Sequence, residues 1–480
     1  MKNIKIKLVY SIVLTCLFVA TSCKKSFLDE SPSTGLPSGE AIQSVQDLST
    51  AVNGVYSAIL GDQDNSYRFY YGGDFTLYAD VKGSDFVNMD SYNQLSPVGR
   101  YQHDQYSDFS EGYYKTMYVA LARINDILDR AKALNVSDDE KASYNNDLGQ
   151  LHALRGLVHF DLARLYAQLP TVASDMNAAN SGIPIADKTF GVDYKPTRAT
   201  LKQTYDFIIS ELTESLPLLT KSKTTGYINY WAAEALRARV YLYLNENNAA
   251  LADAADVIKN SPYSLYTLAD YTTAWDKEGT SEALFEILTT EQYNSQWNSV
   301  GSYTSPAGYA ECAATDSFVK FIKSDSADVR SQMVAYEDDN GNEGGYYPLK
   351  YPGRAGSMYV NNPKVIRLSE VYLIAAEAAF KGGSANGALS ALDYINNLRK
   401  NRITDYSPVT SLTIDDILNE RRKELFAEGH MVWDFWRNGK SVTNPAVGAV
   451  KGSDPLAIVA IPYREIQIAG ANNLVQNPGY

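Results

Sequence analysis

The segment Ala153-Leu154-Arg155-Gly156-Leu157-Val158-His159-Phe160 recurs later in the chain as Ala235-Leu236-Arg237-Ala238-Arg239-Val240-Tyr241-Leu242. Both copies have apolar residues at helical spacing, and each is typical of the first helix of a helix-turn-helix repeat. After the second copy, Ala250, Ala254 and Pro262 follow at close to the tetratricopeptide spacing of small residues and a terminal proline. Because small side chains let neighbouring helices approach closely, the repeat predicts a stack of helical hairpins that forms a rigid scaffold.

Helical periodicity continues well beyond these two copies. Thr200 with Gln203 and Ser137 with Glu140 fit capping boxes, in which two side chains satisfy the free amides of a first helical turn. The alternative, unrelated amphipathic helices that carry alanine by chance, stays open for each pair of helices. The spacing predicts helices over 110–134, 140–168, 200–219, 229–245, 248–260, 367–381, 385–400 and 414–428.

Long stretches without a sustained helical pattern lie between the helices, at 61–105, 170–198 and 262–363. Loops of this length in a compact protein are usually functional. In the third stretch, the turn pair Asn340-Gly341 predicts a short hairpin between 334–337 and 345–350, and 458–461 fits a further strand. We therefore expect a mainly α fold, a tetratricopeptide-like helical-hairpin scaffold with long irregular loops and a few short β-strands.

The amino terminus has the features of a lipoprotein export signal. Three lysines precede an apolar run over 8–20 that is too short to cross a bilayer as a helix. The run ends in Ala20-Thr21-Ser22-Cys23, small residues before a cysteine that can carry lipid. The alternative is an ordinary secretory signal with an accidental cysteine at the cut. We expect a signal peptide over 1–22, a flexible tether over 23–39 that begins at lipidated Cys23, and a single domain over 40–480 with loop-rich excursions at 61–105 and 262–363.

Composition restricts the classes of function. The formal net charge of −13 becomes −16 once the three signal lysines are removed, which argues against nucleic acid as a partner. After cleavage and lipidation of Cys23, Cys312 is alone, so no intrachain disulfide is available and folding depends on burial. The 36 tyrosines are unusual, because tyrosine combines an apolar face with a hydrogen-bonding tip and suits a surface that holds an amphipathic ligand. A tyrosine-rich helical core accounts for some of them.

Patterns typical of catalysis are absent from the sequence, which has no Gly-x-Ser-x-Gly, no His-Glu-x-x-His, no P-loop and no Cys/His cluster. His152 and His159 are better explained as core or groove residues than as ligands, and the charged surroundings of His430 predict a buried ion-pair network. Oxygen-bearing residues at 338–343 suit calcium less well than a solvated hairpin tip. We expect no enzyme, no cofactor and no metal, although 56 acidic residues leave a glycoside hydrolase with paired carboxylates open.

Five ordered segments resemble the SusD/RagB family of outer-membrane lipoproteins. They are Cys23 to Asp29, Asn362 to Ala378, Ile395 to Arg399, Glu420 to Gly439 and Gln476 to Tyr480. His430-Met431 departs from the family, which more often has a basic residue followed by an aromatic or polar one. The resemblance implies a tetratricopeptide-like core that packs on a SusC-like TonB-dependent transporter and carries a glycan site on outward-facing loops. It also implies a lipid-anchored, cell-surface location on the outer membrane.

Binding residues of this family are poorly shared in sequence, so we predict the site from chemistry. A pyranose ring has a face of polarised C–H bonds and an edge of hydroxyls, which suits an exposed aromatic ring with polar groups at its rim. The alternative for any one ring is packing under its own loop. The predicted groups are Trp297, Tyr303 and Tyr309 with Asn294, Gln296 and Asn298; Tyr67, Phe69, Tyr70 and Tyr71 with Asp64 and Arg68; and Tyr346 with Tyr347.

Two acidic residues, Asp80 and Asp85, stand where the family tends to place carboxylates after its first helix. They either accept sugar hydroxyls or, as we favour, organise their loop by accepting backbone amides.

We predict a surface glycan-binding lipoprotein that captures oligosaccharides and delivers them to the transporter. The open alternatives are a binder of peptides or another nutrient in the same transporter system, a protein-interaction scaffold, and a secreted glycoside hydrolase.

Overall fold

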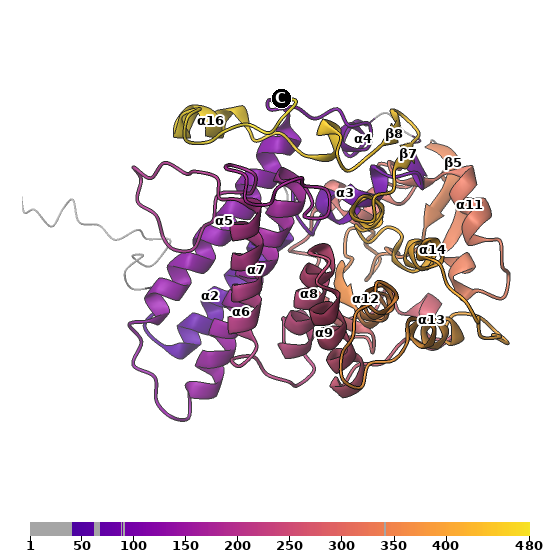
Figure 1. The fold of residues 1–480 in the computed structure, drawn as a ribbon, viewed down its shortest axis with the longest axis horizontal. Coiled ribbons are helices and arrows are strands. Elements are labelled where there is room, and N and C mark those ends of the chain that lie inside the picture. The colour runs from indigo at the N-terminus through magenta and orange to yellow at the C-terminus, as the bar shows by residue number, and fades with distance from the viewer. Residues whose placement is uncertain (1–40, 62–67, 88, 90–91, 340–341) are drawn as a thin grey trace, which may run out of the picture.

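Three helical hairpins form the centre of the molecule, and the two copies of the repeated segment lie in the first two of them. The computed structural model describes residues 41–61, 68–87, 89, 92–339 and 342–480. The first copy lies in α6 (Lys141–Tyr166) and the second in α8 (Tyr230–Tyr243). The hairpins are α6 with α7 (Leu201–Ser215), α8 with α9 (Asn247–Asn260), and α12 (Leu368–Phe380) with α13 (Ala391–Lys400), and they stack side by side (Figure 1). The predicted scaffold is confirmed.

Small residues explain how closely these helices pack. A Cβ atom on Gly156 would lie 3.0 Å from Leu212 Cγ, and one on Gly149 would lie 2.9 Å from Leu218 Cβ. In α8, four alanines that include Ala235 and Ala238 are fully buried between the neighbouring helices. The glycine at the centre of the first copy therefore brings α7 against α6.

Three helices before residue 110 in the described part of the chain were not predicted, one of them the four-residue α4 (Ser96–Gly99). The helix α2 (Val45–Leu60) packs on α5 (Asp108–Ala131) and is capped by Ser44, whose side chain accepts the Asp47 amide. The helix α3 (Asp74–Val81) lies within 61–105, where we expected irregular structure. All eight of its residues are buried, so it has no polar face and shows no amphipathic period.

The caps agree with the sequence at one predicted site and differ at the other. Thr200 and Gln203 form the predicted capping box of α7. The Ser137 hydroxyl donates to Glu140, but a turn over 138–140 intervenes and α6 begins only at Lys141. The Ser137 side chain therefore closes a turn before the helix instead of capping it.

Short antiparallel strand pairs accompany the helices. The predicted hairpin is present as β4 (Val334–Asp339) and β5 (Asn342–Pro348), while its tip at Asn340-Gly341 lies outside the described residues, so the calcium alternative stays untested. The strand predicted over 458–461 is wrong, because the Val459 amide donates to the Leu165 carbonyl in α6 and not to a strand. The other pairs are β1 (Phe86–Val87) with β3 (Ala313–Ala314), β2 (Ala283–Glu286) with β6 (Lys364–Arg367), and β7 (Val442–Asn444) with β8 (Gly448–Val450).

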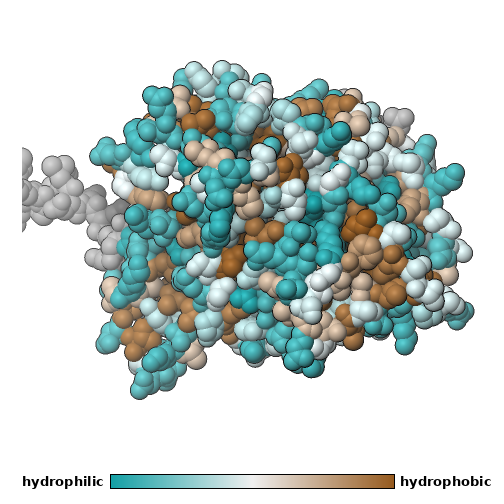
Figure 2. Space-filling model, viewed as in Figure 1, coloured by the Kyte–Doolittle hydropathy of each residue, from teal (hydrophilic) through white to brown (hydrophobic). Residues whose placement is uncertain are grey.

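Shorter helices and a large continuous core complete the fold. One cluster of buried apolar residues runs from Ile42 to Leu474. On the face shown in Figure 2, hydrophilic residues surround small scattered apolar patches. Over the described part of the chain, no helix is both long enough and apolar enough to span a membrane. The remaining helices are α4 (Ser96–Gly99), α10 (Val300–Tyr303), α11 (Asp316–Ile322), α14 (Ile414–Leu425), α15 (Met431–Arg437) and α16 (Tyr463–Ala469).

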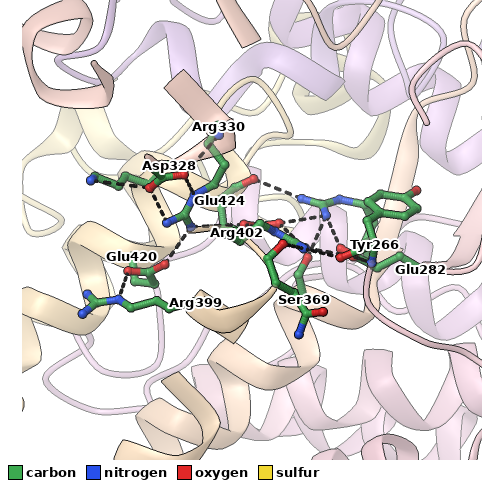
Figure 3. A network of polar contacts seen from close by, with 12 residues as sticks. Tyr266, Glu282, Asp328, Arg330, Ser369, Arg399, Arg402, Glu420 and Glu424 are labelled. Carbon is green, nitrogen blue, oxygen red and sulfur yellow. Dashed lines mark hydrogen bonds and ion pairs between the residues drawn. The ribbon is translucent and has the colours of Figure 1, made fainter. Parts of the chain in front are cut away.

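A buried network of arginines and carboxylates joins the carboxy-terminal helices to the loops (Figure 3). The Glu424 carboxylate on α14 accepts hydrogen bonds from Arg402 at 3.0 Å, Arg367 at 3.1 Å and Arg330 at 3.2 Å. Arg402 also donates to Glu282 at 2.8 Å. These side chains have at most 1% of their surface exposed. Since every charge has a partner, the network fixes the loops relative to α14.

The ion-pair network predicted around His430 is also present. Asp434 in α15 accepts from Arg421 at 2.7 Å and from Arg437 at 2.8 Å, and Arg437 reaches Glu377 in α12 at 2.6 Å. The His430 ring is buried, which lowers the pKa of His430 well below its usual value. His430 is therefore neutral at pH 7, and the network links α14 and α15 to the hairpin scaffold.

Candidate functional site

Four aromatic rings meet at one exposed surface, which we call the aromatic ledge: Tyr92, Trp297, Tyr309 and Tyr359. The ring centroid of Trp297 lies 5.7 Å from that of Tyr309 and 5.6 Å from that of Tyr359. Tyr92 extends the row, 5.1 Å from Tyr309. Trp297 is 47% exposed and Tyr92 is 50% exposed, while the other two rings are half-buried. The prediction that Trp297 and Tyr309 lie together at the surface is confirmed.

The position of Trp297 and Tyr359 depends on a close backbone contact. Trp297 lies in a 3₁₀ turn, Gln296–Asn298, directly before α10. A Cβ atom on Gly301 in α10 would lie 2.1 Å from the Met358 carbonyl oxygen, so only glycine lets the Tyr359 loop approach this closely. The Asn361 amide donates to the same carbonyl at 2.7 Å and fixes the loop.

A buried polar group holds the ledge from beneath. The Tyr303 hydroxyl donates to Asp74 at 2.6 Å, and Arg68 Nε donates to the other Asp74 oxygen at 2.8 Å. Burial raises the pKa of Asp74, although the Arg68 guanidinium opposes the shift. The Tyr303 ring, 5.9 Å from that of Tyr309, is fully buried, so the prediction that it contacts ligand is wrong. Its phenol turns inward because the buried Asp74 carboxylate needs donors.

Glu311 fixes the segment that carries Tyr92 next to the other rings of the ledge. Its carboxylate accepts the backbone amides of Gln94 at 2.9 Å, Leu95 at 2.5 Å and Ser96 at 2.6 Å. An anion at this position satisfies the free amides at the start of α4 and fixes the segment that carries Tyr92. Glu311, Tyr92 and Tyr359 could not be predicted from the sequence, because no local pattern shows which distant segments meet.

Polar side chains surround the rings. Asn298, one of the predicted neighbours, is half-buried, and its Oδ1 atom lies 3.3 Å from the Tyr303 hydroxyl oxygen. Arg68, also predicted, donates to the Gln94 side chain at 3.0 Å and is only 16% exposed in its side chain. Gln296 is exposed beside Trp297. Flat rings with amide groups at their edge can stack on the C–H face of a sugar and bind its hydroxyls.

The second predicted aromatic group is not a surface. Tyr70 is fully buried, and its hydroxyl donates to Asp161 at 2.8 Å. Tyr71 donates to the same carboxylate at 3.0 Å, and Phe69 is buried as well. The predicted binding role of Tyr70 is therefore wrong, because Asp161 in α6 draws these phenols into the core. Tyr67 and Asp64 lie outside the described residues.

The third predicted group lies on the hairpin and does not join the ledge through any ring contact among the described residues. Tyr346 is half-buried and packs on Tyr336 with ring centroids 5.6 Å apart, while Tyr347 is buried. Asp80 is buried and accepts the Gly429 amide, so it is not available to a sugar. Our favoured explanation holds in that Asp80 binds a backbone amide, but that amide belongs to a distant segment and not to its own loop.

His152 and His159, the two histidines of α6, both have partners within the protein. Among the described residues, His152, Glu211 and Glu214 form the only group with three side chains close enough to share a metal ion. Arg155 already donates to both Glu211 oxygens at 2.7 Å, and its positive charge opposes a cation at that position. Burial lowers the pKa of His159 to about 4, and its Nε2 atom accepts the Ala186 amide at 3.0 Å.

Comparison with known proteins gives matches over both halves of the chain. Residues 26–242 match a family described as starch-binding associating with outer membrane, and residues 266–480 match the SusD family. SusD-like protein P38 of Formosa agariphila is 22% identical, with 94% of each chain covered. The crystal structure of a SusD superfamily protein from Bacteroides thetaiotaomicron is 30% identical, covers 91% of this chain and 100% of its own, and superimposes with a TM-score of 0.83.

A further structure shares the fold at lower identity. Surface glycan-binding protein A from Bacteroides thetaiotaomicron, solved in complex with laminarihexaose, is 20% identical and covers 90% of this chain and 99% of its own, with a TM-score of 0.71.

Proposed function

The chain belongs to the SusD family, and from this we propose that it captures oligosaccharides on its aromatic ledge at the cell surface and delivers them to a SusC-like TonB-dependent transporter. We propose further that lipid on Cys23 holds it on the outer membrane and that it catalyses no reaction. The observation that carries the proposal is the convergence of four rings from three separate segments on one exposed surface.

The construction of the ledge supports binding of a ring-shaped, amphipathic ligand. Trp297 leaves about half of its surface in water, while Tyr303 and Glu311 are buried and hold its neighbours in place. Because the residues beneath the rings are already ordered, less conformational entropy is lost when a ligand binds. The C–H face of a pyranose can then replace water on the exposed rings.

The carboxylates that hold the ledge favour binding over hydrolysis. A glycosidase needs two carboxyl groups that face the scissile bond from opposite sides. Asp74 and Glu311 are both buried, and their oxygens already accept hydrogen bonds from protein groups. Neither is free to donate a proton to a glycosidic oxygen or to activate water.

Calorimetry of the mature chain against a panel of oligosaccharides that includes laminarihexaose tests the proposal. We expect one or more sugars to bind, with Trp297→Ala and Tyr309→Ala each weakening affinity about tenfold, roughly 1.4 kcal/mol. Tyr336→Ala is the matched control, because this ring is 58% exposed on the hairpin and has no ring contact to the ledge. Unchanged affinity in both ledge variants would contradict the site. Release of reducing sugar would instead support the hydrolase alternative.

Peptides titrated in the same way separate the nutrient classes. Binding of peptides without any sugar binding would replace the glycan by the peptide alternative within the same family.

Cys23→Ser tests the anchor: we expect the variant to leave the outer-membrane fraction. Co-purification of a SusC-like transporter with the wild-type chain from outer membranes tests the partner, and a chain that never co-purifies with one would contradict delivery.

A further inference from the structure

A hollow lies between α5 and the loop over 184–196 and reaches Glu465 in α16, and none of its lining residues belongs to the ledge. The ribbons of α5 and α16 lie at the upper left of Figure 1. We call this hollow the loop groove. Its volume is 420 Å³, within the range of about 300–1,000 Å³ found for small-ligand sites. Four aromatic rings line it: Tyr114 and Tyr118 from the helix, Phe190 and Tyr194 from the loop.

The two loop rings are stacked on each other and not on the core. The Phe190 and Tyr194 centroids lie 3.8 Å apart with the ring planes only 14° from parallel. Tyr194 is 41% exposed, and neither ring belongs to the cluster of buried apolar residues. Across the groove, Tyr114 and Tyr118 lie 4.5 Å apart. Apolar ring faces therefore line both walls of an open groove.

The base of the loop is fixed by side chains of the scaffold. The Tyr118 hydroxyl donates to the Pro184 carbonyl at 2.7 Å, and Asn125 Nδ2 donates to the carbonyls of Ala186 and Lys188 at 3.0 Å each. His159, as described, accepts the Ala186 amide. A groove whose loop is held by these four hydrogen bonds is formed before any ligand arrives, which lowers the cost of binding.

The two copies of the repeated segment differ at this loop. Arg155 in the first copy pairs with Glu211 and also donates to the Asp187 carbonyl at 3.1 Å. The equivalent Arg237 in the second copy makes a two-pronged contact with Asp253, at 2.8 and 2.9 Å, and holds no loop backbone. The first repeat thus carries an added contact that positions the groove.

Polar side chains at the rim complete the groove. Lys188 and Thr189 come from the loop, Lys115 from α5 and Glu465 from α16. The outer end of the loop is tied to α16 by Lys195, which donates to the Ile468 carbonyl at 2.7 Å. Walls of ring faces with amine, hydroxyl and carboxylate groups at the edge match a ligand with two apolar faces and a polar perimeter, which describes a pyranose.

We propose that the loop groove is a second carbohydrate-binding site, separate from the ledge, that takes a sugar ring between its helix wall and its loop wall. The inference rests on the proposed function, because it assigns the same class of ligand to a second place. Two sites on one chain raise the avidity for a long glycan without tighter binding at either site.

Titration of the full mature chain with laminarihexaose and the other oligosaccharides of the panel tests this. We expect two sites per chain in the wild type and one in the Trp297→Ala/Tyr309→Ala variant. The Phe190→Ala/Tyr194→Ala variant should lose the other site, with at least tenfold weaker binding there. Val192→Ala is the matched control: it lies on the same loop, fully exposed, and does not line the groove. Since both loop rings lie outside the core, we expect the melting temperature of the double variant to stay unchanged.

Three other outcomes would each contradict a second sugar site in the loop groove. A single site that only the ledge changes remove would overturn this inference and leave the proposed function intact. Absence of sugar binding in the wild type would contradict both. A Phe190→Ala/Tyr194→Ala chain that titrates sugar normally but no longer co-purifies with its transporter would assign the groove to a protein contact and overturn the inference.

Discussion

Glu424→Gln removes one charge from the centre of the buried network and keeps the shape of the side chain. In the wild type, this carboxylate is bound by three guanidinium groups, all buried. Removal of one partner from a buried ion pair leaves the opposite charge without compensation and costs about 3–5 kcal/mol. We expect a loss of that size in the free energy of unfolding, because the amide cannot neutralise Arg367, Arg402 or Arg330.

Chemical denaturation of both chains at several pH values measures the loss. Burial would raise the pKa of Glu424, but the three arginines outweigh burial and hold this pKa well below its usual 4.5. The difference in unfolding free energy should therefore be constant from pH 8 to pH 5 and shrink as the pH falls below about 4.5.

Asp206→Asn is the control for a carboxylate that is exposed. Asp206 pairs with Lys202 at 2.6 Å at the surface, with 60% of its side chain exposed, so its replacement should cost less than about 0.5 kcal/mol. Equal losses for Glu424→Gln and Asp206→Asn would refute the argument that the network stabilises the fold through burial.

Three further changes test other parts of the structure. Tyr303→Phe leaves buried Asp74 with one donor fewer and should cost about 1–3 kcal/mol of unfolding free energy; unchanged stability in denaturation would contradict the inward-facing hydroxyl. Gly301→Ala should weaken oligosaccharide affinity about tenfold, roughly 1.4 kcal/mol, by displacing the Tyr359 loop; in calorimetry the control Gly54→Ala, with open space around its Cβ, should not. Burial lowers the pKa of Lys82 well below 10.5, so this amine binds a proton more readily in the unfolded chain than in the folded one. The unfolding free energy of the wild type relative to Lys82→Met should therefore rise between pH 7 and pH 10, by at most about 1.4 kcal/mol per pH unit. A difference that does not change with pH would count against a neutral Lys82.

The helical scaffold could be predicted because its helices have one apolar face. The 3.6-residue period is present in α5, α7 and α9. Most ends of these helices lie within a few residues of the predicted ends. α3 could not be predicted in the same way, because the folded chain buries all eight of its residues and leaves the helix without a polar face. Ser137 with Glu140 shows that a capping pattern also fits an isolated turn.

The site could be predicted only in part. Trp297 and Tyr309 were identified from composition and loop context, since large rings in a polar loop indicate a surface. The same reasoning failed for Tyr303 and Tyr70, whose hydroxyls find buried carboxylates far away in the sequence, at Asp74 and Asp161. A loop sequence alone does not show whether such a partner exists.

The missing rings of the ledge depend on contacts between distant segments. Tyr92 reaches it through amides bound by Glu311, more than 200 residues away, and Tyr359 through the close approach of its loop to Gly301. Neither contact leaves a local pattern. An acidic residue beside an alanine and a glycine in a short helix are common in any sequence.

A crystal structure of the chain with the oligosaccharide that binds most tightly in the panel shows whether the ledge holds sugar. We expect a pyranose ring stacked on Trp297 or Tyr309, with its hydroxyls near the amide groups at the edge of the ledge. A sugar bound elsewhere, with the ledge left in contact with water alone, would contradict it.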